Sequence, residues 1–282
     1  MSLREKLQEL HPRRFFLETW LQMDREAEAE RKSRKAEGRG YDWQPLLALC
    51  TGALFLTAME YLGMATQWRS VVQWGLDQNI VFFAELTRSE WWLLCDHAWW
   101  AGWRVLGFFL LPLVVIKLSG QRIREQGLEL KGLREHAWIY FLCFAVVFVC
   151  VVGVSFSEEF ASYYPFYRLA NRSWADFIAW EMLYAAQFFS LEFFFRGWWL
   201  KAGKRAMGSH AIFVMVVPYV MIHFGKPMLE TVGAIIAGVV LGTLAMKTRS
   251  IWSGFLIHVS VAVSMDIAAL IQTRGLPEQF WP

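Results

Sequence analysis

The stretch "AWIYFLCFAVVFVCVVGV" at residues 137–154 contains no charged residue. Its length approaches the ~20 apolar residues that a helix needs to cross a bilayer. Six other apolar segments, most of similar length, lie at residues 45–64, 99–118, 174–195, 210–224, 231–246 and 252–271. The sequence therefore predicts an all-α polytopic membrane protein with about seven transmembrane helices.

The composition of the 282-residue chain favours the same class. Hydrophobic residues make up 56% of it and charged residues only 19%, whereas a soluble domain usually carries about 25% charge. Sixteen tryptophans fit this class, because Trp gathers at membrane–water interfaces. The four cysteines show no metal-type spacing, so we expect buried thiols rather than disulfides. The net charge of +3 is too small to indicate a nucleic-acid partner, and the expected surroundings are a lipid bilayer.

Basic residues gather at alternate ends of the apolar segments. They concentrate in residues 1–42, in the loop 119–136, and in residues 196–205 and 247–249. The positive-inside rule then places the N-terminus in the cytoplasm and the C-terminus outside, and we expect the bacterial inner membrane. The amphipathic stretch 65–98 is predicted to lie at the interface. An eighth span within it is the second interpretation, because it would break the alternation of basic loops.

No linker divides the chain, but its character changes along its length. The N-terminal part is polar, and its predicted helix breaks at Gly38 and Gly40. Most of the ionisable residues that lie inside apolar segments come after residue 180. The predicted parts are a charged cytoplasmic tail (1–42), N-terminal transmembrane helices with an amphipathic external segment (43–173), a core that carries the ionisable groups (174–272) and a short C-terminal tail (273–282).

A charged side chain in lipid costs roughly 2.5–3.5 kcal/mol or more, so each one inside an apolar segment is a functional hypothesis. The stretch "SLEFFFRGWW", residues 190–199, places Glu192 and Arg196 four residues apart on one helix face. Arg196 lies where the segment meets a basic loop, and we expect it to reach the lipid headgroups. Glu181 lies three turns earlier, near the same face. A structural pair that only orients the helix is the alternative.

Two histidines follow on later apolar segments. "VPYVMIH" ends at His223, and "SIWSGFLIH" ends at His258, about 12 Å into the last segment. Two carboxylates, Glu230 and Asp266, follow these histidines along the chain. One suitable chemistry uses a glutamate as general base on water, with histidines stabilising the oxyanion. In the other, His and Glu bind a divalent metal such as zinc. No HExxH pair is present, so no cofactor is expected and the metal stays open.

The run from Glu192 to His258 resembles the CPBP family of CAAX prenyl proteases and bacteriocin-processing (Abi) enzymes. Members of this family carry the motifs EExxxR, FxxxH and HxxxN on successive helices. Here "LEFFFRG" supplies Glu192 and Arg196, "YVMIH" supplies Tyr219 and His223, and "HVSVA" supplies His258. The resemblance covers about residues 174–270. It implies an intramembrane endopeptidase that acts on a membrane-anchored protein or peptide.

Two positions depart from the family motifs. Leu191 stands where the first glutamate is expected, and Ala262 stands where the asparagine is expected. Glu192 then does the work of both carboxylates, or Glu230 or Asp266 supplies the missing group. The third interpretation is a proteolytically inactive scaffold that binds a partner.

A transporter or proton relay is a further alternative, in which Glu60, Glu181 and Glu192 line a path. The chain shows no two-fold repeat of the kind that many transporters have. The placement of His223 poses a separate difficulty, since counting puts it toward the outer end of its segment and Glu192 toward the inner end of its own. They can meet if the helix is tilted or kinked at Pro218, or if residues 197–210 form an interfacial helix and the next span begins near Ala211.

Overall fold

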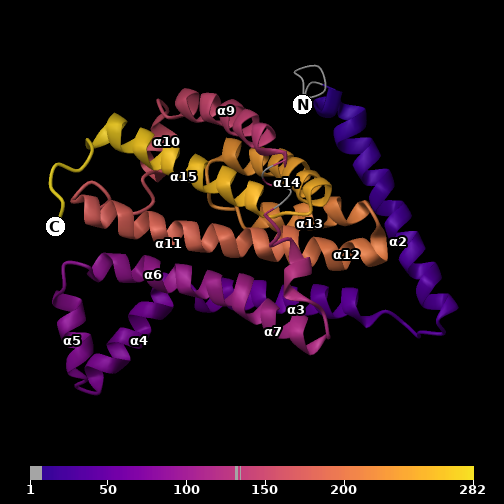
Figure 1. Ribbon diagram of the computed structural model, residues 1–282. Helices are drawn as coiled ribbons and strands as arrows, with labels where there is room; N and C mark the ends of the chain where they lie inside the picture. Colours follow the sequence, from indigo (N-terminus) through magenta and orange to yellow (C-terminus); the bar gives the residue numbers. More distant parts are fainter. Residues whose placement is uncertain (1–7, 131–132, 134) are drawn as a thin grey trace. The chain divides into compact units, whose positions relative to one another are not determined.

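The structure is a computed structural model, and it describes residues 8–130, 133 and 135–282. Helices account for most of this part of the chain, and no β-strand occurs in it (Figure 1). One isolated bridge joins Leu128 and Ser250. In the first half of the chain the elements are η1 (Arg13–Leu17), α2 (Glu18–Ala36), α3 (Trp43–Leu62), α4 (Ala65–Asp77), α5 (Val81–Arg88), α6 (Trp92–Val105), η2 (Leu106–Leu110), α7 (Leu111–Leu118) and η3 (Ile123–Gln126). In the second half they are α9 (Ala137–Val154), α10 (Glu158–Tyr163), α11 (Trp174–Glu192), η4 (Phe193–Trp199), α12 (Leu200–Met207), α13 (His210–Met221), α14 (Met228–Thr248) and α15 (Trp252–Thr273).

The prediction of an all-α polytopic membrane protein is confirmed. Among the described residues, five helices are long and apolar enough to cross a membrane: Trp43–Leu62, Trp92–Leu118, Ala137–Val154, Met228–Thr248 and Trp252–Thr273. The second of these is α6, η2 and α7 in succession. The stretch 65–98, within which an eighth span was the second interpretation, contains two short helices, α4 and α5, and the start of α6.

The fourth predicted segment does not end near Arg196. Helix α11 passes directly into the π-helical turn η4 and then into α12, so the helical path runs from residue 174 to residue 207. Arg196 therefore lies well inside this path, and only 1% of it is exposed. The expectation that Arg196 reaches the headgroups is wrong, because the protein itself encloses the guanidinium.

The fifth apolar segment forms a shorter helix than its hydropathy pattern predicted. Helix α13 contains 12 residues and ends at Met221, a length of about 18 Å at 1.5 Å per residue. That is well short of a hydrocarbon core of ~30 Å. The helical residues 198–207 precede it, and α13 begins at His210, close to the predicted start near Ala211. A helix of this length need not carry its C-terminal end across the hydrocarbon core.

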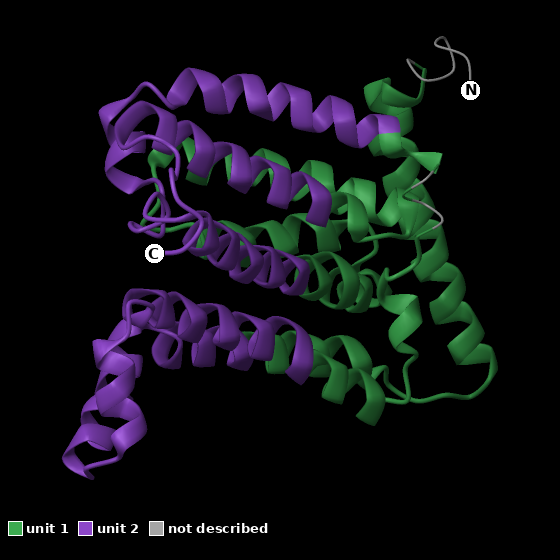
Figure 2. Cartoon of the chain, turned by 60° about the vertical axis from the view of Figure 1, so that its left-hand side comes forward, with its two compact units in different colours: residues 1–53, 112–137, 192–254 green, residues 54–111, 138–191, 255–282 purple. Residues whose placement is uncertain are grey.

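Contacts divide the chain into two compact units, each assembled from three separate segments (Figure 2). Unit 1 comprises residues 1–53, 112–137 and 192–254, and unit 2 comprises residues 54–111, 138–191 and 255–282.

In unit 1, α13 packs along α14, and α2 packs against α12 and α14. The α13–α14 contact depends on small residues of α14. A Cβ atom added at Gly238 would lie 2.8 Å from a methyl carbon of Val216, and one at Gly242 would lie 3.0 Å from the terminal methyl of Met215. Small residues at this spacing let two helices approach closely.

The N-terminal helix α2 ends at Ala36, just before Gly38 with φ +65°, as the sequence predicted. It is tied to the rest of unit 1 by charge. Glu26 forms ion pairs with Lys204 at 2.7 Å and Arg249 at 3.5 Å. Asp24 accepts a hydrogen bond of 2.7 Å from the backbone N–H of Ser209, immediately before α13. Charges that looked like a solvated face of a tail thus hold α2 against α12, α13 and α14.

In unit 2, the packing is dominated by aromatic rings from α6, α11 and the loop between α10 and α11. His97, Trp100, Phe166, Trp180 and Tyr184 lie within 4.7–6.4 Å of one another, measured between the centroids of contacting rings. The C-terminal segment closes the start of α11, because carbonyls of residues 279 and 280 accept from the N–H groups of residues 174 and 175. These N–H groups would otherwise have no partner inside the helix.

Candidate active site

The predicted Glu192–Arg196 pair exists and is enclosed by protein. Nη1 of Arg196 lies 2.9 Å from Oε1 of Glu192, and neither side chain is more than 1% exposed. Isolated burial of either charge would be very unfavourable, so each stabilises the other. The pair spans the junction between α11 and η4, whose seven residues are all buried. Such π-helical turns are rare and occur often at functional sites.

Two glycines make room for this junction. A Cβ atom at Gly254, in the first turn of α15, would lie 2.2 Å from Oε2 of Glu192. A Cβ atom at Gly197 would lie 2.4 Å from the carbonyl oxygen of Gln126. The backbone of α15 therefore approaches the carboxylate directly, and the end of η3 approaches the backbone of η4.

Tyr219 contacts the guanidinium of Arg196 from α13. The Cζ atom of Arg196 lies 3.9 Å from the centroid of the tyrosine ring, well within the range of a cation–π interaction. Phe195 packs edge-on against the same ring at 5.5 Å. From the sequence, Tyr219 was only the counterpart of a motif phenylalanine, and nothing in the motif predicted its contact with Arg196.

His223 lies in the turn that follows α13, two residues after the helix ends. Its Nδ1 lies 2.7 Å from the carbonyl oxygen of Tyr219. A carbonyl oxygen only accepts, so Nδ1 must carry the proton. Nε2 then bears a lone pair in the neutral ring and an N–H in the imidazolium form. The start of α14 holds the turn in place, because the hydroxyl of Thr231 donates to the carbonyl of His223 at 3.0 Å.

Glu230 sits in the first turn of α14, where its oxygen lies 2.7 Å from Nζ of Lys226. This ion pair connects the turn that bears His223 to α14. Glu230 therefore belongs to the same local structure as His223, within unit 1.

The other predicted residues belong to unit 2. The ring of His258, on α15, stacks parallel to Phe188 of α11 at 5.2 Å. Asp266, two turns further along α15, is fully buried and accepts a hydrogen bond of 2.7 Å from the indole of Trp180. The carboxyl groups of Asp266 and Glu181 interact with each other. These contacts connect α11 to α15.

The two positions that depart from the family motifs are both filled by buried apolar side chains. Leu191 is 4% exposed and Ala262 is 5% exposed. Ala262 packs in the aromatic cluster that contains Tyr167, Trp180 and Tyr184. Neither side chain offers a polar atom to a reaction.

The structure therefore groups the predicted residues in two sets. Glu192, Arg196, His223 and Glu230 lie in unit 1, and His258, Asp266 and Glu181 lie in unit 2. Sequence reasoning missed Gly254 and the role of Tyr219. The only sequence signal for Tyr219 was its motif position. Gly254 had no sequence signal, because a close approach of two backbones depends on both helices.

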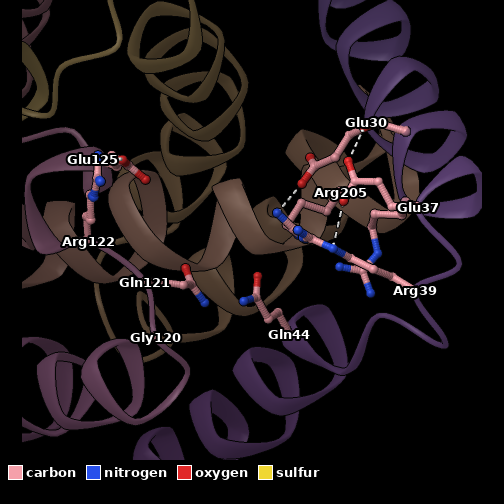
Figure 3. Close-up of a pocket in the computed structure, with 11 residues that line it drawn as sticks. Glu30, Glu37, Arg39, Gln44, Gly120, Gln121, Arg122, Glu125 and Arg205 are labelled. Carbon is pink, nitrogen blue, oxygen red and sulfur yellow. Dashed lines mark hydrogen bonds and ion pairs between the residues drawn. The ribbon is translucent and has the colours of Figure 1, made fainter.

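A polar pocket of ≈ 320 Å³ also lies in unit 1, and none of the predicted site residues lines it (Figure 3). Its arginines face carboxylates already. Arg39 pairs with Glu37 at 2.8 Å, and Arg205 pairs with Glu30, toward which it points in Figure 3. The pocket is a network of mixed charge rather than the candidate active site.

Burial and neighbouring charges shift the pKa values of charged groups around α12. Burial lowers the pKa of Lys201 to about 8, and the neighbouring charge of Lys204 adds to that effect. Burial alone would raise the pKa of Glu26, but hydrogen bonds from Lys204 and Gln22, together with the charges of Lys204 and Arg249, outweigh it. The pKa of Glu26 consequently lies below its ordinary value of 4.5.

No set of three His, Cys, Asp or Glu side chains within residues 8–130, 133 and 135–282 is arranged to hold a metal ion. The metal alternative is therefore tested by experiment below rather than by geometry.

Helices able to span a membrane, and a buried Glu192–Arg196 ion pair that Tyr219 connects to His223, define an integral membrane protein with a charged site in its interior. Residues 174–264, less than half of the chain, match the profile of the family described as type II CAAX prenyl endopeptidase Rce1-like. This confirms the resemblance predicted from the motifs and associates the region with CAAX-type intramembrane proteases in general. No curated protein and no solved structure matches the chain.

Proposed function

We propose that this protein is an intramembrane endopeptidase of the CPBP type that cleaves a membrane-anchored protein or peptide. The observation that carries the proposal is the fully buried Glu192–Arg196 pair, which Tyr219 contacts beside His223. The family profile over residues 174–264 supports the same reaction class. A buried ion pair stabilises a fold no more than apolar side chains of similar size would. Its presence in an apolar helix therefore favours a role other than stability.

In the proposed reaction, Glu192 accepts a proton from water, and the water oxygen attacks the carbonyl carbon of the scissile peptide bond. The bond to nitrogen then breaks, and the proton passes from Glu192 to the leaving amine. Arg196 positions the helix and offsets the charge of Glu192. His223 and His258 donate hydrogen bonds to the oxyanion that forms in between.

The geometry of His223 adds a condition to this scheme. Because Nδ1–H is directed at the carbonyl of Tyr219, only Nε2 can point a hydrogen at an oxyanion. Nε2 carries a hydrogen together with Nδ1 only in the imidazolium form. To donate through Nε2, His223 must therefore carry a proton on both ring nitrogens.

The decisive test uses the purified protein in nanodiscs and a fluorescent prenylated peptide that ends in a CAAX sequence. Glu192→Gln, His223→Ala and His258→Ala should each reduce cleavage strongly, whereas Glu28→Gln, an exposed residue of α2, should not. Cleavage that persists unchanged in Glu192→Gln would rule out the proposed base. Loss of activity with a chelator, restored by zinc, would favour the metal alternative.

The second candidate is a proteolytically inactive scaffold with the same helices. The buried apolar residues Leu191 and Ala262 favour it, because they replace two polar groups of the family motifs. It predicts no cleavage of any membrane-anchored peptide. Alanine at Glu192 would then alter stability or partner binding alone.

We further propose that the N-terminus lies in the cytoplasm of a bacterial cell and that the protein resides in the inner membrane. Four basic segments, predicted to share one side, contact each other within unit 1. Lys204 and Arg249 pair with Glu26, and Lys201 donates to the carbonyl of Glu125. These contacts support one common side, and the positive-inside rule supports the cytoplasmic one.

A further inference from the structure

We propose that Tyr219 is a positioning residue that fixes Arg196 and His223 at the same time. The inference rests on the proposed function, because it concerns how two groups of that site are held. It assigns to this residue a role that its motif position does not state. Three sets of contacts carry it, all of them within unit 1.

The first set involves the face of the ring. The Arg196 guanidinium carbon lies 3.9 Å from the ring centroid, while a nitrogen of the same guanidinium lies 2.9 Å from Glu192. Cation–π attraction is strongest where water is excluded, and both side chains here are only 1% exposed. The guanidinium is thus held between a carboxylate and an aromatic face, which fixes its direction toward Glu192.

The second set involves the backbone of Tyr219. Its carbonyl lies in the last turn of α13, where helical carbonyls lose their usual N–H partners. The N–H of His223 bonds to Val220 at 2.9 Å instead of to Tyr219. The Tyr219 carbonyl therefore accepts from the imidazole, at 2.7 Å, and the edge-on ring contact of 4.8 Å restricts the imidazole further.

The third set holds Tyr219 itself. Phe195 packs edge-on against it from η4, and α14 closes the other side. A Cβ atom at Gly238 would lie 3.3 Å from Cδ1 of Tyr219, so the backbone of α14 approaches the ring closely. A ring enclosed by η4 and α14 has little room to move, and it can hold two neighbours in fixed directions.

The proposal depends on the aromatic face and the backbone carbonyl, and the hydroxyl adds a side-chain hydrogen bond with Arg196. Tyr219→Phe keeps the face and the carbonyl, so it should lower kcat less than Tyr219→Leu does. Tyr219→Leu keeps the carbonyl but removes the aromatic face, and kcat should fall about tenfold or more, as expected for a lost desolvated cation–π contact. KM should change less than about threefold, because a buried ring does not touch substrate.

The coupling between Tyr219 and Arg196 distinguishes positioning from general loss of packing. In an Arg196→Gln background, Tyr219→Leu should reduce kcat little further, since the group it positions is gone. Tyr140→Leu, which removes another buried tyrosine from α9, serves as the matched control. It should lower stability without a selective effect on kcat, and its effect should add to that of Arg196→Gln.

Two results would overturn the proposal: kcat of Tyr219→Leu within twofold of the original protein, or effects of Tyr219→Leu and Arg196→Gln that are fully additive. A thermal-unfolding cycle of the same four proteins measures the Tyr219–Arg196 coupling without any substrate. If the original protein cleaves nothing but this coupling is present, the proposed function fails and the positioning contact stands. If the coupling is absent as well, both fail.

Discussion

The Glu192–Arg196 pair is buried so completely that neither charge can turn to water when the other is removed. A buried ion pair contributes little net stability compared with apolar side chains of similar size, but a single stranded charge is strongly destabilising. The structural and the chemical roles of the pair can therefore be separated by comparing single and double substitutions.

Arg196→Leu alone should lower the free energy of unfolding by about 3–5 kcal/mol, because it leaves the Glu192 carboxylate buried and unpaired. Adding Glu192→Leu should restore most of the lost stability, but peptide cleavage should not return. Denaturation in detergent and the nanodisc assay measure the two outcomes. A double variant that cleaves peptide at the original rate would show that the pair is purely structural.

Gly254 gives a second prediction at this scale. Gly254→Ala places a methyl group 2.2 Å from the present position of the Glu192 carboxylate oxygen, so the carboxylate must move. We expect cleavage to drop by at least tenfold, with destabilisation of about 1–3 kcal/mol from overpacking. Gly153→Ala, at a helical glycine of α9 with no atom within 4 Å of the added Cβ, is the matched control. Equal effects of the two substitutions would contradict the prediction.

The residue-scale features were only partly predictable. The i, i+4 spacing of Glu192 and Arg196 is a property of one helix, so the sequence was sufficient to predict the pair. The aromatic face over Arg196 and the glycine against Glu192 come from other helices. No periodicity within one segment reports which face of another segment meets it, and so the sequence did not reveal either contact.

At the scale of the elements, the charged helix α2 differs most from its predicted role. It was expected to form part of a tail, and the structure ties it to α12, α13 and α14 through Asp24, Glu26 and their partners. The sequence did predict the helix and its end at Gly38. It could not predict the docking, because Glu26 and Lys204 are 178 residues apart and either charge alone is typical of a solvated surface.

This docking predicts a dependence on pH. The pKa of Glu26 is lowered in the folded protein, so its contribution to stability is complete above the ordinary value of 4.5 and is lost as the pH falls through the lowered value. Glu26→Gln should remove that part of the pH dependence of Tm, and salt should weaken the contribution in the original protein. Glu28→Gln, on the same helix in an exposed pair with Lys32, should change little. Identical pH profiles for Glu26→Gln and the original protein would contradict the assignment.

Helix ends also show where hydropathy is insufficient. Residues 196–207 are too polar for a span, so the predicted segment stopped before them. Their Lys, Arg, Leu and Ala residues are nonetheless good helix formers, and the helix continues to Met207. The end of an apolar run and the end of a helix are set by different properties. For this reason the sequence placed Arg196 at the end of a segment, whereas the structure places it inside the helical path.

For the whole molecule, the seven predicted segments all correspond to helices, but they differ in kind. Five are long and apolar enough to span a membrane, one is interrupted by a π-helical turn and carries the acid–base pair, and one contains only 12 residues. Composition and segment lengths were enough to predict the class. They were not enough to predict which segments are specialised for the site, because that depends on contacts.

The topology gives the prediction at this scale. Single cysteines placed at Lys35, Arg124 and Lys247 in a protein without its four native cysteines should all react from the cytoplasmic side of intact cells, because the basic segments that bear them are predicted to lie there. A cysteine at Glu278 should react from the outside. Labelling with a membrane-impermeant maleimide before and after permeabilisation measures this. Opposite labelling of residues 124 and 247 would contradict both the alternation and the shared contacts of unit 1.

The π-helical turn η4 has one further consequence, for the alignment of sequences. Its closing bond runs from the N–H of Leu200 to the carbonyl of Phe195, five residues back, and so one turn holds an additional residue. Each residue of an α-helix advances the face by about 100°. The extra residue of the turn therefore rotates the face of the following helix. In a relative that lacked one residue here, the counterparts of Lys204 and Arg205 would point about a quarter-turn away from the acidic residues of α2. A single-residue gap at residues 197–199 would mark a helix whose charged face meets a different partner, although the motif from Glu192 to Arg196 would be unchanged.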